Sequence, residues 1–129
     1  MKRKKIVAGN WKMNMTMDES IKLIAELELI SENNIEIKIA PAYTNLYKSR
    51  SLLMSSQIEV IAQNIHQEKN GAYTGEISAE MLKSIGIKTV IIGHSERRQY
   101  FNETDSILSK KVKTALEHSL NIIFCVGEE

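Results

Sequence analysis

Residues 89–96 read Thr-Val-Ile-Ile-Gly-His-Ser-Glu, and this stretch decides the type of fold. Thr89–Ile92 is a short apolar run rich in β-branched residues, which is typical of a strand buried on both faces of a parallel sheet. Gly93 ends the run, and Ser95-Glu96 reads as the first turn of a helix. A strand that passes directly into a helix is one step of a parallel α/β fold, and His94 lies at the junction.

Four more apolar runs lie on either side of this stretch: Ile6–Ala8, Ile35–Ala40, Ile58–Ala62 and Ile122–Val126. These are also expected to be buried strands, and helical patterns fill the gaps between the five runs. Such alternation predicts a parallel sheet with right-handed crossovers. Two architectures remain open here, an open doubly wound sheet or part of a (β/α)8 barrel. No linker-like segment or change of composition marks a boundary, so residues 1–129 are expected to form one domain.

The expected helices begin after residues that can cap them: Thr16, Thr44, Ser78 and Thr104. Glu19 completes a capping box with Thr16. Apolar side chains then recur at helical spacing on one face of the first and fourth helices. Those faces are expected to include Ile24 and Ile30 in the first helix, and Leu108 and Leu116 in the fourth.

The composition excludes several classes of protein. The 129 residues are 43% hydrophobic and 26% charged, as in globular domains. The formal net charge is only +1, which gives no electrostatic case for a nucleic acid or an anionic membrane. No apolar run approaches the ~20 residues of a membrane span. A single Cys indicates a reducing compartment, so a cytoplasmic protein is expected.

Polar side chains follow three of the expected strands where those strands end. Asn10 and Lys12 follow the first strand, Gln63 and Asn64 the third, and His94 the fourth. The active sites of parallel α/β folds lie at the carboxyl ends of the strands. The sequence therefore predicts that Asn, Lys and His side chains gather at one rim.

These residue types suit chemistry at an oxygen atom that develops negative charge. His94 could donate a hydrogen bond from a neutral ring, because the positive end of a helix disfavours a second charge there. Lys12 could hold a phosphate or stabilise an oxyanion, to which Asn10 could donate an amide hydrogen. Each residue also has a structural alternative. His94 could satisfy backbone groups, Lys12 could be a solvated charge, and Asn10 could be a turn residue.

The charged residues next to His94 have two interpretations. Glu96 either interacts favourably with the positive end of a helix dipole, or it orients the Lys12 side chain without touching the substrate itself. Arg97 and Arg98 are expected to pair with carboxylates on the surface.

Other features point away from cofactor chemistry. The segment Gly71–Glu76 lacks the Walker spacing, so it predicts a protruding loop in which an exposed Tyr73 contacts a protein. Cys125 lies in an apolar run and is interpreted as a core residue rather than a nucleophile. Three His and one Cys are too scattered for a zinc site, and no role is assigned to His66 or His118.

Two motifs make the chain resemble the triosephosphate isomerase family: Asn10-Trp11-Lys12-Met13-Asn14 and Gly93-His94-Ser95-Glu96-Arg97-Arg98. The second motif is highly specific to that family. Further matches occur in family order: Ala62-Gln63-Asn64, Gly71–Ser78 and Cys125-Val126-Gly127-Glu128. The resemblance covers essentially the whole chain. It implies a (β/α)8 TIM barrel, of which this sequence would supply the first four βα units and the fifth strand.

The resemblance also implies an activity, the interconversion of dihydroxyacetone phosphate and glyceraldehyde 3-phosphate in glycolysis and gluconeogenesis, without a cofactor or metal. By the family's pattern, His94 would be the electrophile and acid that moves protons among the oxygens of an enediolate. Lys12 would bind substrate and stabilise negative charge, and Asn10 would help form the oxyanion site. Glu96 and Ser95 would hold these groups in position without touching the substrate.

The loop Gly71–Ser78 resembles the family's dimer loop, which here contains Tyr73, Thr74 and Gly75. Thr74 would reach toward the Lys12 and His94 of a neighbouring subunit. The resemblance thus implies a homodimer, with a complementary C-terminal half of the barrel as the other possible partner.

The length departs from the family's pattern, because a complete barrel has about 250 residues. The family's general base is a glutamate after the sixth strand, and neither Glu96 nor Glu128 matches its motif. We therefore expect the 129-residue chain alone to be inactive, with its first and fifth strands as open edges. The alternative is a catalytically silent half-barrel that only self-associates or binds a complementary chain.

Overall fold

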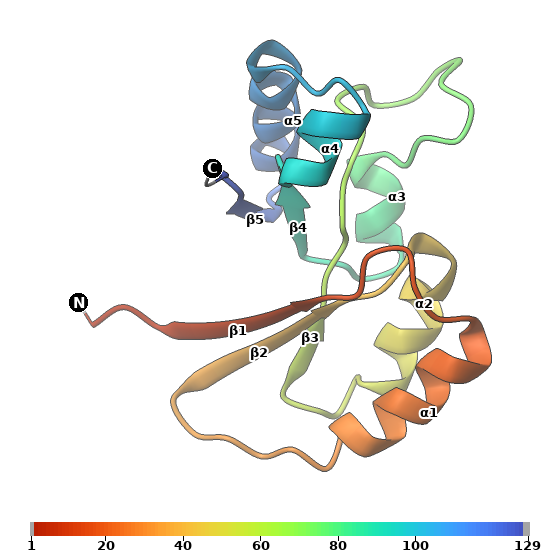
Figure 1. Cartoon of the computed structure of the whole chain (residues 1–129), viewed down its shortest axis with the longest axis vertical. Helices are drawn as coiled ribbons and strands as arrows, with labels where there is room; N and C mark the ends of the chain where they lie inside the picture. The colour runs from red at the N-terminus through yellow and green to blue at the C-terminus, as the bar shows by residue number, and fades with distance from the viewer. Residues whose placement is uncertain (1, 128–129) are drawn as a thin grey trace. The chain divides into compact units, whose positions relative to one another are not determined.

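The computed structural model describes residues 2–127, and the chain divides into two compact units, Met1–Gln63 (unit 1) and Asn64–Glu129 (unit 2). Along the chain the elements are β1 (Lys5–Asn10), α1 (Met17–Leu27), β2 (Ile35–Ala40), α2 (Tyr43–Leu52), β3 (Ile58–Val60), α3 (Ala79–Ser84), β4 (Thr89–Ile92), α4 (Ser95–Tyr100), α5 (Asp105–Glu117) and β5 (Asn121–Phe124) (Figure 1). The predicted α/β fold with parallel strands is confirmed.

Unit 1 contains a three-stranded parallel sheet in the order β1-β2-β3. Asn10 at the end of β1 lies opposite Ala40 at the end of β2, and Val60 at the end of β3 lies opposite Ile39. The carboxyl ends of the three strands therefore meet at one edge of this sheet. Its helices α1 and α2 contact each other, and α1 contributes the buried Ile24 and α2 the buried Leu46 to the core.

The prediction of a fully buried strand is wrong for β1. Ile6 is 50% exposed and Val7 is 59% exposed. The reason is the position of β1 at the end of its sheet, where it pairs with β2 alone among residues 2–127. The open edge expected at the first strand is thus present in unit 1.

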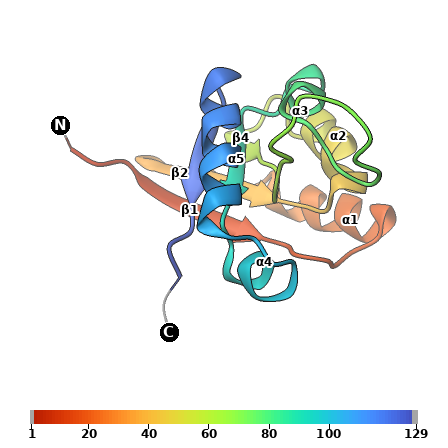
Figure 2. The same cartoon turned by 90° about the horizontal axis from the view of Figure 1, so that it is seen from above.

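Unit 2 contains the parallel pair β4 and β5, in register from Thr89 opposite Asn121 to Ile92 opposite Phe124. The helix α5 lies against both strands (Figure 2). Its Leu108 and Ala115 are buried, as are all four residues of β4. Within residues 2–127, unit 1 thus contributes three parallel strands and unit 2 two.

Capping residues start three helices as predicted. The Thr16 hydroxyl accepts a hydrogen bond from the Glu19 N–H, and the Glu19 carboxylate accepts one from the Thr16 N–H, which confirms the capping box. Ser78 caps α3 and Thr104 caps α5. The predicted start of α2 is wrong, since Thr44 lies inside the helix and no side chain caps it.

Two residues assigned to apolar helix faces do not lie on them. Ile30 is 41% exposed, because α1 ends before it. Leu116 is 63% exposed, since it lies eight residues after Leu108, a rotation of about 80° around the helix. No helix within residues 2–127 is long and apolar enough to cross a membrane.

Candidate active site

The loop after β1 holds Lys12 in an uncommon backbone conformation. Its φ is 56°, in the left-handed region that a residue with a side chain rarely adopts. The Lys12 N–H donates a hydrogen bond to Oδ1 of Asn10 at 3.0 Å, and the Asn14 amide donates one to the Trp11 carbonyl at 2.8 Å. Asn10 therefore acts as the turn residue named as its structural alternative, and only its amide nitrogen could serve an oxyanion.

Gln63 fixes the other side of this loop. Its Nε2 donates hydrogen bonds to the Lys12 carbonyl and to the Ala40 carbonyl, both at 2.8 Å. Because Ala40 ends β2, the Lys12 loop is tied to the carboxyl edge of the sheet. Sequence reasoning placed Gln63 at the rim without a role, since a contact with backbone carbonyls leaves no motif beyond a polar residue after an apolar run.

His94 is the N-cap residue of α4, and its Nδ1 accepts a hydrogen bond from the Glu96 N–H at 3.2 Å. A neutral imidazole that accepts at Nδ1 carries its proton on Nε2. The Glu96 Oε2 lies 3.6 Å from the same Nδ1. His94 is thus held in the tautomer that donates a hydrogen bond from Nε2.

The predicted residues are divided between the two units. Asn10 and Lys12 belong to unit 1, and His94, Ser95 and Glu96 belong to unit 2. Asn10 ends β1, and His94 follows β4 after a single residue, so both positions at strand ends are confirmed. The support that Glu96 would give Lys12 stays a prediction.

The chain matches the family model for triosephosphate isomerase over residues 5–129. This chain belongs to the triosephosphate isomerase family. It is 57% identical over 129 residues to the triosephosphate isomerase of Flavobacterium psychrophilum, a match that covers 98% of this chain and 52% of the relative. It is 52% identical over 127 residues to the triosephosphate isomerase of Alkaliphilus metalliredigens, which covers 98% of this chain and 51% of that relative. The chain spans about half the length of the curated relatives it matches.

Membership of the triosephosphate isomerase family favours the TIM barrel over the doubly wound sheet, since both architectures have parallel strands.

Arg97 does not pair with a surface carboxylate, and that prediction is wrong. Its Nε donates a hydrogen bond to Oε2 of Glu103 at 2.8 Å, and the Glu103 side chain is only 4% exposed. The same oxygen accepts a hydrogen bond from Nζ of the buried Lys111 at 2.6 Å. Nζ of Lys111 also donates to Asn64 at 2.8 Å. This Glu103 cluster (Asn64, Arg97, Glu103 and Lys111) connects α4, α5 and the segment after β3, and the sequence carried no sign of it.

Charge within the Glu103 cluster shifts two pKa values. Burial raises the pKa of Glu103, but the hydrogen bonds from Lys111 and Arg97 outweigh burial and leave this pKa below its ordinary value of 4.5. Burial lowers the pKa of Lys111 by more than its bond to Glu103 raises it. Glu103 is therefore the ionised centre of the cluster.

The loop Gly71–Ser78 carries an exposed Tyr73, as predicted, at 44% exposure. The Tyr73 ring lies 4.5 Å from the His66 ring, centroid to centroid. The His66 Nδ1 also lies 3.4 Å from the Glu76 carboxylate, and the backbone N–H of His66 donates a hydrogen bond to the Ile77 carbonyl at 2.8 Å. His66 thus gains a structural role at the base of the loop, while the dimer contact stays a prediction.

Cys125 is half-buried, and burial raises the pKa of its thiol although the nearby Arg98 lowers it. A raised thiol pKa favours a structural role over a nucleophile. Glu128, the last residue of the motif that starts at Cys125, lies outside the described residues. Within residues 2–127 no group of three His, Cys, Asp or Glu side chains could hold a metal ion.

Proposed function

We propose that this chain supplies the proton-shuttling and oxyanion-binding part of a triosephosphate isomerase active site, with a triose phosphate as substrate. The observation that carries the proposal is the tautomer of His94. Its Nδ1 accepts a hydrogen bond from the Glu96 N–H, so Nε2–H is the donor toward a substrate oxygen. Membership of the triosephosphate isomerase family supports the same assignment.

Each residue acts on a different part of the reaction in this proposal. His94 polarises a substrate oxygen and then carries a proton between the two oxygens of the enediolate. The ammonium of Lys12 stabilises the developing negative charge, aided by a loop that Asn10 and Gln63 hold in place. The amide nitrogen of Asn10 donates to the same oxyanion. A carboxylate on a complementary polypeptide removes the proton from carbon, because no residue of this chain matches the family's general base.

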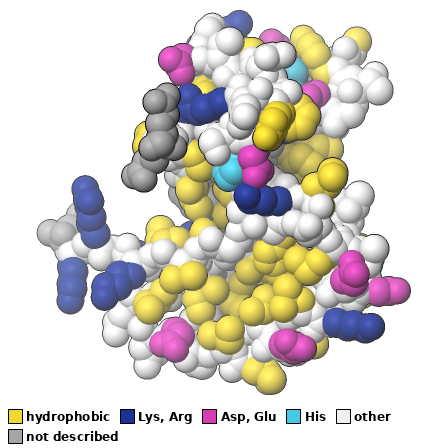
Figure 3. All heavy atoms as spheres, viewed as in Figure 1, with side chains coloured by type: hydrophobic (Ala, Val, Ile, Leu, Met, Phe, Trp, Pro, Cys, Tyr) yellow, Lys and Arg dark blue, Asp and Glu magenta, His cyan; other side chains and the backbone are white. Residues whose placement is uncertain are grey.

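The open side of unit 1 supports a complementary polypeptide as partner. A groove of about 490 Å³ lies between α1 and the strands β1 and β2. Its lining is mainly apolar and includes Val7, Trp11, Leu23, Leu27, Ile30 and Ile37. Figure 3 shows hydrophobic side chains gathered over this part of unit 1. A strand added to the edge of β1, followed by a helix with an apolar face, would cover both the edge and the groove.

A coupled isomerase assay tests the proposal. We expect no turnover from the 129-residue chain alone. Turnover is expected when it is combined with a polypeptide that comprises the part of the Flavobacterium psychrophilum relative outside the match. His94→Gln should abolish that turnover. His118→Gln should leave it unchanged, because His118 is the C-cap of α5 and its ring contacts the Thr114 carbonyl.

Equal turnover by the His94→Gln and His118→Gln variants would overturn the assignment of His94. Family-like turnover by the chain alone, lost in His94→Gln, would keep that assignment and remove the need for a partner.

The second candidate function is a catalytically silent half-barrel. The exposed Ile6 and Val7 on β1 and Phe124 on β5, which is 47% exposed, favour association through apolar edges. The exposed Tyr73 loop favours a homodimer in the same way. An assembly that forms with the complementary polypeptide but never turns over substrate would support this candidate. For either function we propose the cytoplasm, where enzymes of glycolysis act.

A further inference from the structure

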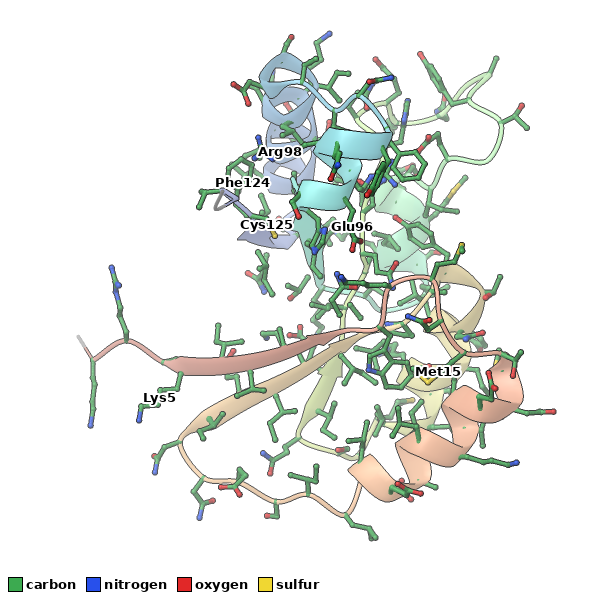
Figure 4. All side chains as sticks on the ribbon, in the orientation of Figure 1. Lys5, Met15, Glu96, Arg98, Phe124 and Cys125 are labelled. Carbon is green, nitrogen blue, oxygen red and sulfur yellow. The ribbon has the colours of Figure 1, made fainter. Side chains whose placement is uncertain are left out.

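Arg98 binds two backbone carbonyls at the ends of neighbouring strands. Its Nε donates a hydrogen bond to the Gly93 carbonyl at 2.7 Å, and its Nη2 donates one to the Cys125 carbonyl at 2.7 Å. A third contact joins Nη1 to Oδ1 of Asp105 at 3.3 Å, and that carboxylate is exposed. Figure 4 shows Arg98, Phe124 and Cys125 grouped where β5 ends. The prediction that Arg98 pairs with a surface carboxylate is confirmed by Asp105, and the two carbonyl contacts add to it.

The two carbonyls lie just beyond the ladder of β4 and β5. Gly93 follows β4 and precedes His94, while Cys125 follows β5 and donates its N–H to the Ile92 carbonyl at 2.9 Å. A guanidinium presents several donors in one plane, so it can bridge two acceptors that a single ammonium cannot reach together in the same geometry. The side chain of Arg98 thus continues the strand pairing where backbone pairing ends.

Gly93 leaves the space that this bridge needs. A Cβ at position 93 would lie 2.9 Å from Nη2 of Arg98 and 3.1 Å from the Cys125 carbonyl oxygen. The φ of Gly93 is also +80°, which disfavours any residue with a side chain. The close contact and the positive φ together explain the Gly at the start of the motif Gly93–Arg98, and the bridge explains the Arg at its end.

We propose that Arg98 is a positioning residue for His94. By holding the Gly93 carbonyl it fixes the peptide bond from which His94 extends, and by holding the Cys125 carbonyl it anchors that peptide bond to the end of β5. The inference rests on the proposed function in one respect, that His94 is the group that meets the substrate. Arg98 itself touches no substrate.

Hydrogen exchange in the full 129-residue chain, measured by mass spectrometry, tests this role. Arg98→Lys keeps the cation but cannot form the bridge, and Arg98→Gln removes both. Amide exchange in residues 122–127 should rise about tenfold or more in both variants, because two charge-assisted hydrogen bonds are lost. Exchange at the imidazole C2–H of His94, followed against pH, should change its profile in both variants, while His66 and His118 keep theirs.

Asp105→Ala is the matched control, since it removes the exposed third contact of Arg98 and leaves both carbonyl contacts in place. It should leave the amide exchange of residues 122–127 and the His94 profile unchanged. A purely structural role for Arg98 would raise amide exchange without moving the His94 profile.

Three outcomes would overturn the proposal. The first is an unchanged His94 profile in Arg98→Lys and Arg98→Gln, whatever their isomerase activity. The second is wild-type behaviour of Arg98→Lys, which would show that charge and not the bridge matters. The third is amide exchange that rises equally across all of unit 2, or a failure of both variants to fold. Either result would make Arg98 a general structural residue. A changed His94 profile in a chain that never supports isomerisation would instead count against the proposed function alone.

Discussion

At the scale of single residues, the cluster around Glu103 holds a buried carboxylate and a buried ammonium of unit 2 in contact. One carboxylate oxygen accepts hydrogen bonds from both Arg97 and Lys111, and the Lys111 side chain is only 3% exposed. Removing one partner from a buried ion pair leaves the others as uncompensated charges, which costs more than the pair contributes.

We expect Glu103→Gln to lower the free energy of unfolding at neutral pH by about 3–5 kcal/mol, because Lys111 then lacks its anion. Folding lowers the pKa of Glu103 below 4.5, so the stability it contributes is present above that pH and is lost as pH falls through the folded pKa. The difference between the variant and the wild type should therefore shrink in acid. Urea unfolding at neutral pH and at several values below pH 4.5 measures it.

The matched control is Glu117→Gln, whose carboxylate lies 3.9 Å from Lys113 at the surface. It should change the free energy of unfolding by less than about 0.5 kcal/mol at any pH. A Glu103→Gln effect that stays constant from neutral pH into acid would refute the assignment of Glu103 as the ionised centre.

At the scale of elements, the sequence predicted the features that depend on residues close together in the chain. The run Ile35–Ala40 and the run Thr89–Ile92 match β2 and β4 to the residue, and the box of Thr16 with Glu19 starts α1. The start of α2 escaped prediction because Thr44 looks like a cap, whereas the helix begins at Tyr43 without one. The link from Gln63 to Lys12 and the cluster at Lys111 also escaped, since both join residues far apart in sequence.

Thr16→Ala should destabilise unit 1 by about 1 kcal/mol, because it removes the hydroxyl that accepts the Glu19 N–H. Ser51→Ala is its counterpart, since Ser51 is exposed inside α2 and caps no helix. That change should have an effect near zero, as Ala has the higher helix propensity. Chemical denaturation of both variants compares the two. Equal losses of stability would mean that the capping box does not hold α1.

At the scale of the whole molecule, the exposed apolar edge of β1 is the feature that we expect to govern association with other chains. The strand β1 pairs on one side only within the described residues, and its Val7 is more than half exposed beside an apolar groove. Exposed edge strands with apolar side chains invite pairing with another chain. The relatives, about twice as long as this chain, contain further sequence that could cover such a surface.

We expect Val7→Lys to weaken self-association of the chain, because a charge on an edge strand opposes pairing with a second strand. Sedimentation velocity should show a smaller mean mass, and binding of a hydrophobic dye should fall. Met54→Lys is the control, since Met54 is 68% exposed but lies outside β1 and the groove. If both changes had the same effect, general surface charge rather than the β1 edge would govern association.

The left-handed backbone at Lys12 has a consequence for how this position tolerates change. A residue with a side chain in that region costs of order 1 kcal/mol or more, and glycine avoids the cost. In a library randomised at position 12, selection for folding alone would enrich Gly and Asn. Under the proposed function, selection for turnover together with the complementary polypeptide would instead retain Lys. The two enrichment profiles would then diverge at this position, which separates the demands of the fold from those of the reaction.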